Sequence, residues 1–265
     1  MKIGFIGAGN MGGALCRAVS EALEKKNIFI ADCDKAKAEA LAKELDITLS
    51  DNKRIAQECD FIVLGVKPQV MADALAPLKE IFSQRKTGFT LISMAAGLST
   101  LKIQEMAGEY PVIRIMPNTP AAVGEGMILY TLKDTSKENV DSFLNAFSKA
   151  GKLSFIEEKH IDAASAVSGC GPAFAFMFMD ALADGGVECG LSYKDALTFA
   201  AQTLLGSAKM VLQTDTHPET LKTNVCSPGG TTIEGVHALE EGAFRATTMN
   251  AVKAAYQKTL KLAGK

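Results

Sequence analysis

Residues 2–13 read KIGFIGAGNMGG, a short apolar segment that runs into three glycines at the spacing G-x-G-x-x-G. We predict a strand over Lys2–Gly7 and a helix over Asn10–Lys25, joined by a tight glycine turn. A strand, a glycine turn and a helix in this order are typical of a dinucleotide site, because the helix N-terminus presents N–H donors to a pyrophosphate. The spacing therefore indicates a Rossmann-like cofactor domain.

The glycines of this turn have separate steric roles. Gly7 permits the turn, Gly9 lets the backbone approach the pyrophosphate, and Gly12 lets helix and strand pack closely. A glycine-rich loop without a ligand is the simpler alternative, but the flanking strand and helix favour nucleotide binding. We expect the cofactor to contact Gly7, Ala8, Gly9, Asn10, Met11 and Gly12.

Strands and helices alternate through the first half of the chain. Alternation of this kind predicts parallel β-α-β units in a doubly wound sheet. Asp34 is expected to cap the helix that follows the second strand. The further predicted elements are strands at Asn27–Ala31, Phe61–Val66, Thr90–Ile92 and Val112–Met116, and a closing helix within Ser136–Ala150.

The second half of the chain changes in character. After Phe155-Ile156 no strand pattern follows, and no Lys or Arg occurs from Ile161 to Tyr193. The segment 174–179 is apolar on all sides, so a helix there needs cover beyond its own small domain. We predict a Rossmann domain over residues 1–155 and an all-α domain over 156–265 that oligomerises.

Asp32 ends the second predicted strand, 20 residues beyond Gly12. A carboxylate at this position accepts ribose hydroxyls and repels a 2′-phosphate, which slightly favours NADH over NADPH. Asp32 or Asp34 as a simple helix cap is the alternative. Lys35 and Lys37 lie close enough in sequence to accept a phosphate instead, so both cofactors stay open.

Three further turn-forming clusters follow predicted parallel strands. Because ligands of such sheets bind at the carboxyl ends of the strands, the shared edge makes these clusters cofactor candidates. Lys67 is suited to a phosphate, and Asn118 to the nicotinamide or its ribose; each taken alone is equally well explained as structural. The candidates are Lys67, Pro68, Ala95, Ala96, Gly97, Pro117 and Asn118.

Composition excludes several classes of protein. Lys and Arg number 28 against 30 Asp and Glu, which gives a net charge of -2 and no general attraction for nucleic acid or acidic membranes. Glycines, Pro172 and Asp180 interrupt the longest apolar stretch, so we expect no membrane span. Three histidines and six cysteines without a C-x-x-C pair indicate no metal centre and reduced thiols in the cytoplasm.

The segment 221–235 reads LKTNVCSPGGTTIEG. Thr231 and Glu234 have the spacing of a capping box, which predicts a helix start. Gly229 and Gly230 expose backbone N–H groups ahead of that helix, and Thr232 adds a hydroxyl beside them. A helix start alone explains the glycines, but the added hydroxyl residues favour an uncharged cradle for a carboxylate.

With this loop the sequence resembles the pyrroline-5-carboxylate reductase family. The resemblance covers the whole chain and is carried by residues 5–12, 66–68, 116–120, 167–173, 206–210 and 225–232. It implies NAD(P)H-dependent reduction of 1-pyrroline-5-carboxylate to L-proline, and a helical domain that forms a homodimer able to assemble further. It also implies that Thr232 contacts the ring nitrogen, that Ser227, Gly229, Gly230 and Thr231 hold the carboxylate, and that Asn52 lies near the adenosine end of the cofactor.

The chain departs mildly from the family pattern. Cys170 stands where serine or alanine is usual, and the turn Asp32-Cys33-Asp34 lacks a basic residue that many NADPH-using members carry. The missing basic residue leaves open whether the enzyme prefers NADPH or NADH, but it does not change the expected reaction.

Two other functions compete with this one. Another imine or keto-acid reductase related to the β-hydroxyacid dehydrogenases would carry a catalytic lysine on the helix that opens the second domain. Residues 166–180 contain none. A dinucleotide-binding sensor without catalysis would have no use for the hydroxyl-lined loop at 227–232.

Overall fold

Apolar residues with buried side chains on both faces form the central strands of an eight-stranded sheet. In the computed structural model, which describes residues 1–262, the strand order is β3-β2-β1-β4-β5-β6-β7-β8. All neighbours are parallel except β6 and β7, which are antiparallel. The strands are β1 Ile3–Ile6, β2 Ile28–Ala31, β3 Thr48–Leu49, β4 Phe61–Leu64, β5 Thr90–Ser93, β6 Val112–Met116, β7 Gly126–Lys133 and β8 Gly151–Phe155.

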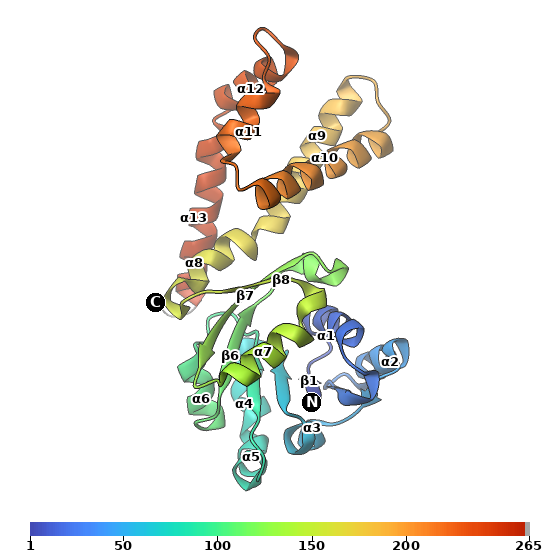
Figure 1. Cartoon of the computed structure of the whole chain (residues 1–265), viewed down its shortest axis with the longest axis vertical. Helices are drawn as coiled ribbons and strands as arrows, with labels where there is room; N and C mark the ends of the chain where they lie inside the picture. The colour runs from blue at the N-terminus through green and yellow to red at the C-terminus, as the bar shows by residue number, and fades with distance from the viewer. Residues whose placement is uncertain (263–265) are drawn as a thin grey trace. The chain divides into compact units, whose positions relative to one another are not determined.

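Helices cover both faces of the sheet (Figure 1). Because successive strand side chains point to opposite faces, Phe5 packs into one apolar cluster with α1, α2 and α7, and Ile6 into a second with α3 to α6. The helices are α1 Asn10–Ala22, α2 Lys35–Leu45, α3 Asn52–Glu58, α4 Met71–Leu75, α5 Lys79–Gln84, α6 Thr100–Ala107, α7 Lys137–Ala146 and α8 Glu158–Ser168, with 3₁₀ turns at Lys25–Asn27, Pro68–Val70, Ala76–Leu78, Thr119–Val123 and Ser148–Ala150.

A buried ion-pair group joins α8 to the sheet. Arg114 of β6 is 2% exposed, and its guanidinium lies 3.0 Å from Asp162 and 3.4 Å from Glu158. Glu158 also accepts hydrogen bonds from the backbone N–H and the hydroxyl of Thr100, both at 2.7 Å. These contacts place α8 with the sheet domain.

The chain divides into two compact units. Unit 1 comprises Met1–Cys170 and the segment from Ala255 onward, and unit 2 comprises Gly171–Ala254. The change to helices alone follows β8, as expected, but the compact units divide later than residue 155 because α8 belongs to unit 1.

Unit 2 is helical throughout. Its helices are α9 Gly171–Glu188, α10 Tyr193–Thr214, α11 Pro218–Val225, α12 Thr231–Glu241 and α13 Phe244–Leu262, the last of which continues into unit 1. Helices α9 and α10 pack against each other as a hairpin.

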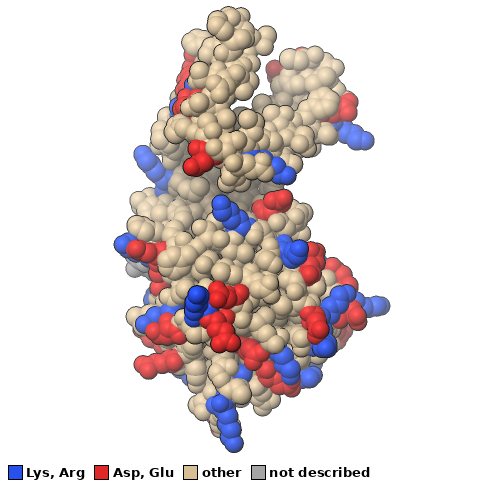
Figure 2. Space-filling view, in the orientation of Figure 1, with Lys and Arg blue, Asp and Glu red and all other residues tan. Residues whose placement is uncertain are grey.

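Large apolar side chains stand exposed on unit 2, among them Met177 at 73%, Leu212 at 69% and Phe176 at 60%. Figure 2 shows that charged side chains gather over unit 1 and are sparse on the visible face of unit 2. The helical stretch Glu158–Glu188 is long and apolar enough to cross a membrane by length and composition, a weak criterion that core helices of soluble proteins also meet. A single copy of this chain leaves that stretch mostly uncovered.

The predicted fold class is confirmed. The strands expected from the sequence form within a few residues of their predicted limits, and Asp34 caps α2 by accepting from the Lys37 N–H. The antiparallel strand β7, the last strand β8 and the two-residue strand β3 were not predicted. Strand β7 returns beside β6 after a short 3₁₀ turn instead of a crossover helix, which reverses its direction.

Candidate functional site

The predicted cofactor residues of unit 1 meet at one edge of the sheet. The glycine loop follows β1, Asp32 follows β2, and the other clusters follow β4, β5 and β6, whose carboxyl ends lie side by side. The strand order reverses at β1, which lies between β2 and β4. Open α/β sheets bind ligands at such a switch point.

The glycine loop has the geometry that its spacing predicts. Gly7 has φ +118°, and a Cβ there would lie 2.5 Å from the carbonyl oxygen of Gly65. A Cβ on Gly12 would collide with the Gly7 carbonyl, whereas a Cβ on Gly9 would meet nothing within 4 Å. The space over Gly9 is therefore open for a ligand, and the other two glycines are required by the protein itself.

Helix α1 begins with unpaired donors. Its N-cap is Gly9, which brings no capping side chain. In the described part of the chain the amides of Asn10, Met11 and Gly12 donate to no protein acceptor. An uncapped helix N-terminus favours an anion through these donors and the helix dipole, so the loop fits the pyrophosphate of a dinucleotide.

Asp32 contacts this loop directly. Its Oδ2 accepts the Ala8 N–H at 2.6 Å, and its Oδ1 accepts the Asp34 N–H at 2.8 Å. Burial acts to raise the pKa of Asp32, but the hydrogen bonds from Ala8 and Asp34 outweigh it, so that the pKa lies below its ordinary value. The carboxylate is thus charged and largely engaged by backbone donors.

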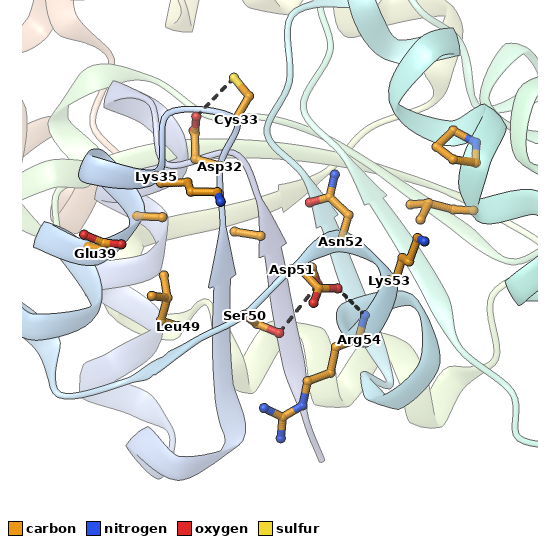
Figure 3. A pocket seen from close by; sticks show the side chains of 14 residues that line it. Asp32, Cys33, Lys35, Glu39, Leu49, Ser50, Asp51, Asn52, Lys53 and Arg54 are labelled. Carbon is orange, nitrogen blue, oxygen red and sulfur yellow. Dashed lines mark hydrogen bonds between the residues drawn. The ribbon is translucent and has the colours of Figure 1, made fainter.

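A cavity of about 810 Å³ opens beside Asp32 (Figure 3). Asn52, at the start of α3, lines it, so the structure brings together the two residues expected at the adenosine end. Ser50, Lys53 and Arg54 also line it and were not predicted, because they follow the short strand β3, which carries almost no sequence signal. The acidic N-cap of α3 was the available signal, since the N–H of Arg54 donates to Asp51.

Asn118 is held by the protein. Its Nδ2 donates to the Ser168 carbonyl at 2.9 Å, and its Oδ1 accepts the Met127 N–H at 2.8 Å. Its amide therefore links the end of β6 to β7 and to the last residue of α8. A contact with the cofactor would have to share these groups.

The remaining candidates at this edge differ in exposure. Lys67 and Ala96 are exposed, Pro68 and Gly97 are half-buried, and Ala95 and Pro117 are buried. The exposed Lys67 side chain is the most accessible of them to a ligand.

The loop of unit 2 ends at an uncapped helix. Helix α12 begins at Thr231 with Gly230 as N-cap and no capping side chain. The predicted helix start is confirmed, but the capping box is wrong, because Thr231 is the first helical residue and not the cap. Within residues 1–262 the amides of Thr231 and Thr232 have no protein acceptor.

Contacts and backbone conformation within the loop before α12 determine its shape. The Gly230 N–H donates to the Ser227 carbonyl at 3.0 Å, and Gly229 has φ +66°, in the left-handed region. Ser227, Gly229, Thr231 and Thr232 are exposed on unit 2. Free N–H groups and hydroxyls at one helix N-terminus suit a carboxylate without a fixed cation.

The histidines of unit 2 have structural partners. His217 caps α11 by accepting the Glu219 N–H on Nδ1, and His237 lies 3.4 Å from Glu241 at the surface. Neither lies in the loop that precedes α12. In the described ranges no three His, Cys, Asp or Glu side chains form a metal cluster.

Comparison with protein-family models gives two matches. Residues 158–262 match the model "Pyrroline-5-carboxylate reductase dimerisation", and residues 2–97 match "NADP oxidoreductase coenzyme F420-dependent". The first match covers α8 and the helical unit, and the second covers the glycine loop and the cavity beside Asp32.

Whole-chain relatives agree with the first model. A pyrroline-5-carboxylate reductase of Arabidopsis thaliana is 42% identical over 98% of this chain and 95% of its own length. The crystal structure of Plasmodium falciparum pyrroline carboxylate reductase with NADP bound has a TM-score of 0.87 at 37% identity, covering 100% of this chain and 98% of that one. A pyrroline-5-carboxylate reductase structure from Coxiella burnetii gives 0.90 at 29%, covering 98% of each chain.

Proposed function

This chain belongs to the pyrroline-5-carboxylate reductase family, and from that membership we propose that it reduces 1-pyrroline-5-carboxylate to L-proline, the last step of proline biosynthesis. It is an NAD(P)H-dependent oxidoreductase acting on a cyclic C=N bond. A reductase of the β-hydroxyacid dehydrogenase type is not favoured, since residues 166–180 hold no lysine and the whole chain matches the pyrroline-5-carboxylate reductases.

Reduction of this substrate needs little acid–base catalysis from the protein. Its imine nitrogen is protonated near neutral pH, which leaves the adjacent carbon electrophilic. The cofactor, when bound, supplies the hydride. The protein must hold the substrate carboxylate and the ring in the reacting orientation, and positioning of this kind lowers barriers by about 7–11 kcal/mol in well-oriented systems. A reductase of this type needs no catalytic histidine.

The uncapped start of α12 is the observation that supports the substrate site. We assign the carboxylate to the loop of Ser227, Gly229, Gly230 and Thr231. The Gly230 N–H is already bonded to the Ser227 carbonyl, so the donors are the loop hydroxyls and the amide of Thr231, which has no protein acceptor among the described residues. Charge-assisted bonds from N–H groups to a carboxylate are the stronger kind of hydrogen bond. Specificity for an imine acid then follows from geometry without a fixed positive charge.

Thr232 is assigned to the ring nitrogen. A hydroxyl accepts from the iminium N–H and remains bonded to the product amine, whereas a strong base would remove the proton and weaken the electrophile. Replacing Thr232 by Ala removes one hydrogen bond to a charged group, worth about 1.5–3 kcal/mol. We expect kcat/KM for 1-pyrroline-5-carboxylate to fall by about 10- to 150-fold, with cofactor affinity nearly unchanged.

Cofactor oxidation with 1-pyrroline-5-carboxylate, followed spectrophotometrically, tests this assignment. Thr223→Ala is the matched control, because the Thr223 hydroxyl donates to the Glu219 carbonyl of its own helix. Wild-type turnover in Thr232→Ala would remove Thr232 from the mechanism. Failure of the wild-type chain to oxidise either NADH or NADPH would refute the proposed reaction.

The cofactor is assigned to the glycine loop of unit 1. The pyrophosphate lies over Gly9 and the first amides of α1, and Asp32 and Asn52 lie at the adenosine end. The nicotinamide end is assigned to the edge formed by Lys67, Pro68, Ala95, Ala96, Gly97, Pro117 and Asn118. The relative whose structure holds NADP supports a nicotinamide dinucleotide here, and the slight preference for NADH stays a prediction from Asp32.

A second copy of the chain is the partner that fits unit 2. The family model that matches this region is named for dimerisation, and its helices expose Phe176, Met177 and Leu212. We propose a homodimer that covers these side chains and assembles further into larger oligomers. We propose that the protein is located in the cytoplasm, in agreement with the prediction of reduced thiols from its cysteines. Residues 156–265 are then the dimerisation and substrate domain, and residues 1–155 the cofactor domain.

Sedimentation without detergent tests the dimer. Met177→Glu places a charge on the apolar face and is expected to lower the measured mass to that of one chain. Leu101→Glu, at a 56% exposed leucine in unit 1, is the matched control and should leave the mass unchanged. A wild-type chain that sediments as a monomer, or that requires detergent to stay in solution, would contradict the homodimer.

A further inference from the structure

The contacts of Asp32 differ from those expected of a residue that selects the cofactor. In the usual arrangement this carboxylate accepts the ribose hydroxyls and so selects NADH. Here Oδ2 accepts the Ala8 N–H at 2.6 Å, from the middle of the glycine loop. One residue earlier, the Ala31 carbonyl accepts the Gly7 N–H at 2.7 Å. The end of β2 is therefore joined to the loop by two adjacent hydrogen bonds.

The second oxygen of Asp32 is also engaged. Its Oδ1 accepts the Asp34 N–H at 2.8 Å and lies 3.4 Å from the Cys33 sulfur, a contact drawn in Figure 3. These bonds fix the turn from β2 into α2. Since both oxygens serve the backbone, the rotamer of Asp32 is set by the loop whether or not a ribose is present.

Two cations that line the cavity, Lys35 and Lys53, form no ion pair among the described residues, whereas Arg54 and the nearby Lys37 do. Lys37 is paired with Asp34 at 3.4 Å, and Arg54 with Glu58 at 2.9 Å. Lys35 lines the cavity and, among residues 1–262, forms no ion pair. In Figure 3 its ammonium group points into the cavity toward Asn52, while the guanidinium of Arg54 points away. Lys35 is the cation of the β2–α2 turn that is available to a phosphate.

We propose that Asp32 is a positioning residue that holds the glycine loop for either cofactor, and that Lys35 is the residue that selects, by binding the 2′-phosphate of NADPH. This inference rests on the proposed function only in requiring a nicotinamide dinucleotide in the cavity. It assigns the choice of cofactor to the turn before α2 instead of the carboxylate that ends β2.

Binding of NADH and NADPH to the purified full chain, measured without the imine substrate, tests both parts. Asp32→Ala removes the acceptor of the Ala8 N–H and should raise Kd for both cofactors by a similar factor, about tenfold or more. Asp32→Asn keeps a carbonyl oxygen for that N–H and should hold both Kd values within about threefold. In a separate steady-state assay with the imine substrate, Asp32→Ala should raise KM for each cofactor by a larger factor than it lowers kcat.

Lys35→Met keeps the aliphatic stem and removes the charge. We expect it to raise Kd for NADPH by about fivefold or more, to leave Kd for NADH within about twofold, and to lose much of the salt dependence of NADPH binding. Lys43→Met, on the same helix but away from the cavity, is the matched control.

Two results would overturn the inference. One is an Asp32→Ala or Asp32→Asn variant that binds NADH more weakly and NADPH more tightly. That result would show that Asp32 selects the cofactor by binding the ribose hydroxyls. The other is a Lys35→Met variant that changes both affinities equally or neither. If Asp32→Ala does not fold, Asp32→Asn and Lys35→Met decide. A wild-type chain that binds cofactor but does not reduce the imine would refute only the proposed function.

Discussion

Replacing Arg114 by Met tests how strongly α8 is fixed to the sheet. The change removes a guanidinium that is 2% exposed and leaves a neutral side chain of similar length facing Asp162, which is 4% exposed. Breaking a buried pair from one side costs about 3–5 kcal/mol. The contact with Glu158, whose side chain is 32% exposed, adds less than about 1 kcal/mol because water screens it.

This loss predicts a large change in melting temperature. A domain of 150–250 residues loses about 2–4 °C per kcal/mol, so Tm should fall by about 6–20 °C. Thermal unfolding followed by far-UV circular dichroism measures it, at one fixed protein concentration because association also stabilises the chain. Arg17→Met is the control, because Arg17 makes a similar pair with Glu44 at the surface, 2.7 Å apart.

A second substitution separates charge from packing. Asp162→Asn in the Arg114→Met background removes the carboxylate charge and should recover part of the lost Tm. An Arg114→Met variant that melts within about 2 °C of wild type, or no lower than Arg17→Met, would refute the reasoning. A full loss with no recovery in the double variant would assign the effect to packing instead.

Two further predictions concern glycines and thiols. Gly12→Ala should lower Tm, because the added Cβ would collide with the Gly7 carbonyl. Gly9→Ala should melt like wild type but raise the cofactor Kd by tenfold or more, because its Cβ would meet no protein atom within 4 Å. Equal Tm values for the two variants would contradict this steric assignment. Burial raises the pKa of Cys16 and Cys59 to about 12 from 9.0, so that only the unfolded chain loses these protons between those values. The free energy of unfolding should therefore fall as the pH rises above 9, by about 1.4 kcal/mol per pH unit for each thiol. The control is the double variant Cys16→Ala, Cys59→Ala. A wild-type Tm that does not decline between pH 9 and 11 relative to this variant would contradict the prediction.

Much of unit 1 could be predicted because its signals are local. The G-x-G-x-x-G spacing, the apolar runs and the capping residue Asp34 act within a few positions of each other, and the structure forms the expected strands and helix starts from them. Strand β7 was not predicted, because its direction depends on its pairing with β6, and the sequence pattern does not encode that pairing. Strand β3 escaped because two residues carry no periodicity.

The limits of prediction at the site are also physical. Residue type and spacing placed Asp32 and Asn118 at the carboxyl ends of their strands, where the structure has them, but did not predict which atoms their side chains contact. The bonds of Asp32 to Ala8 and of Asn118 to Ser168 join segments far apart in sequence. At the start of α12, Thr231 and Glu234 had the spacing of a capping box, yet the glycine before them took the cap position. A spacing rule does not specify which of two adjacent residues leaves the helical conformation.

The division of the chain has a consequence for its synthesis. The chain leaves unit 1 after Cys170 and returns to it at Ala255, so unit 2 is an insertion within unit 1. At about 5–20 residues per second, a ribosome needs roughly 4–17 s to make the 84 residues of Gly171–Ala254. During that time the sheet domain lacks its last segment, while the apolar helices of unit 2 emerge without a partner. The newly made chain is therefore most exposed to aggregation, and most in need of a chaperone, in the interval before its final helix is complete.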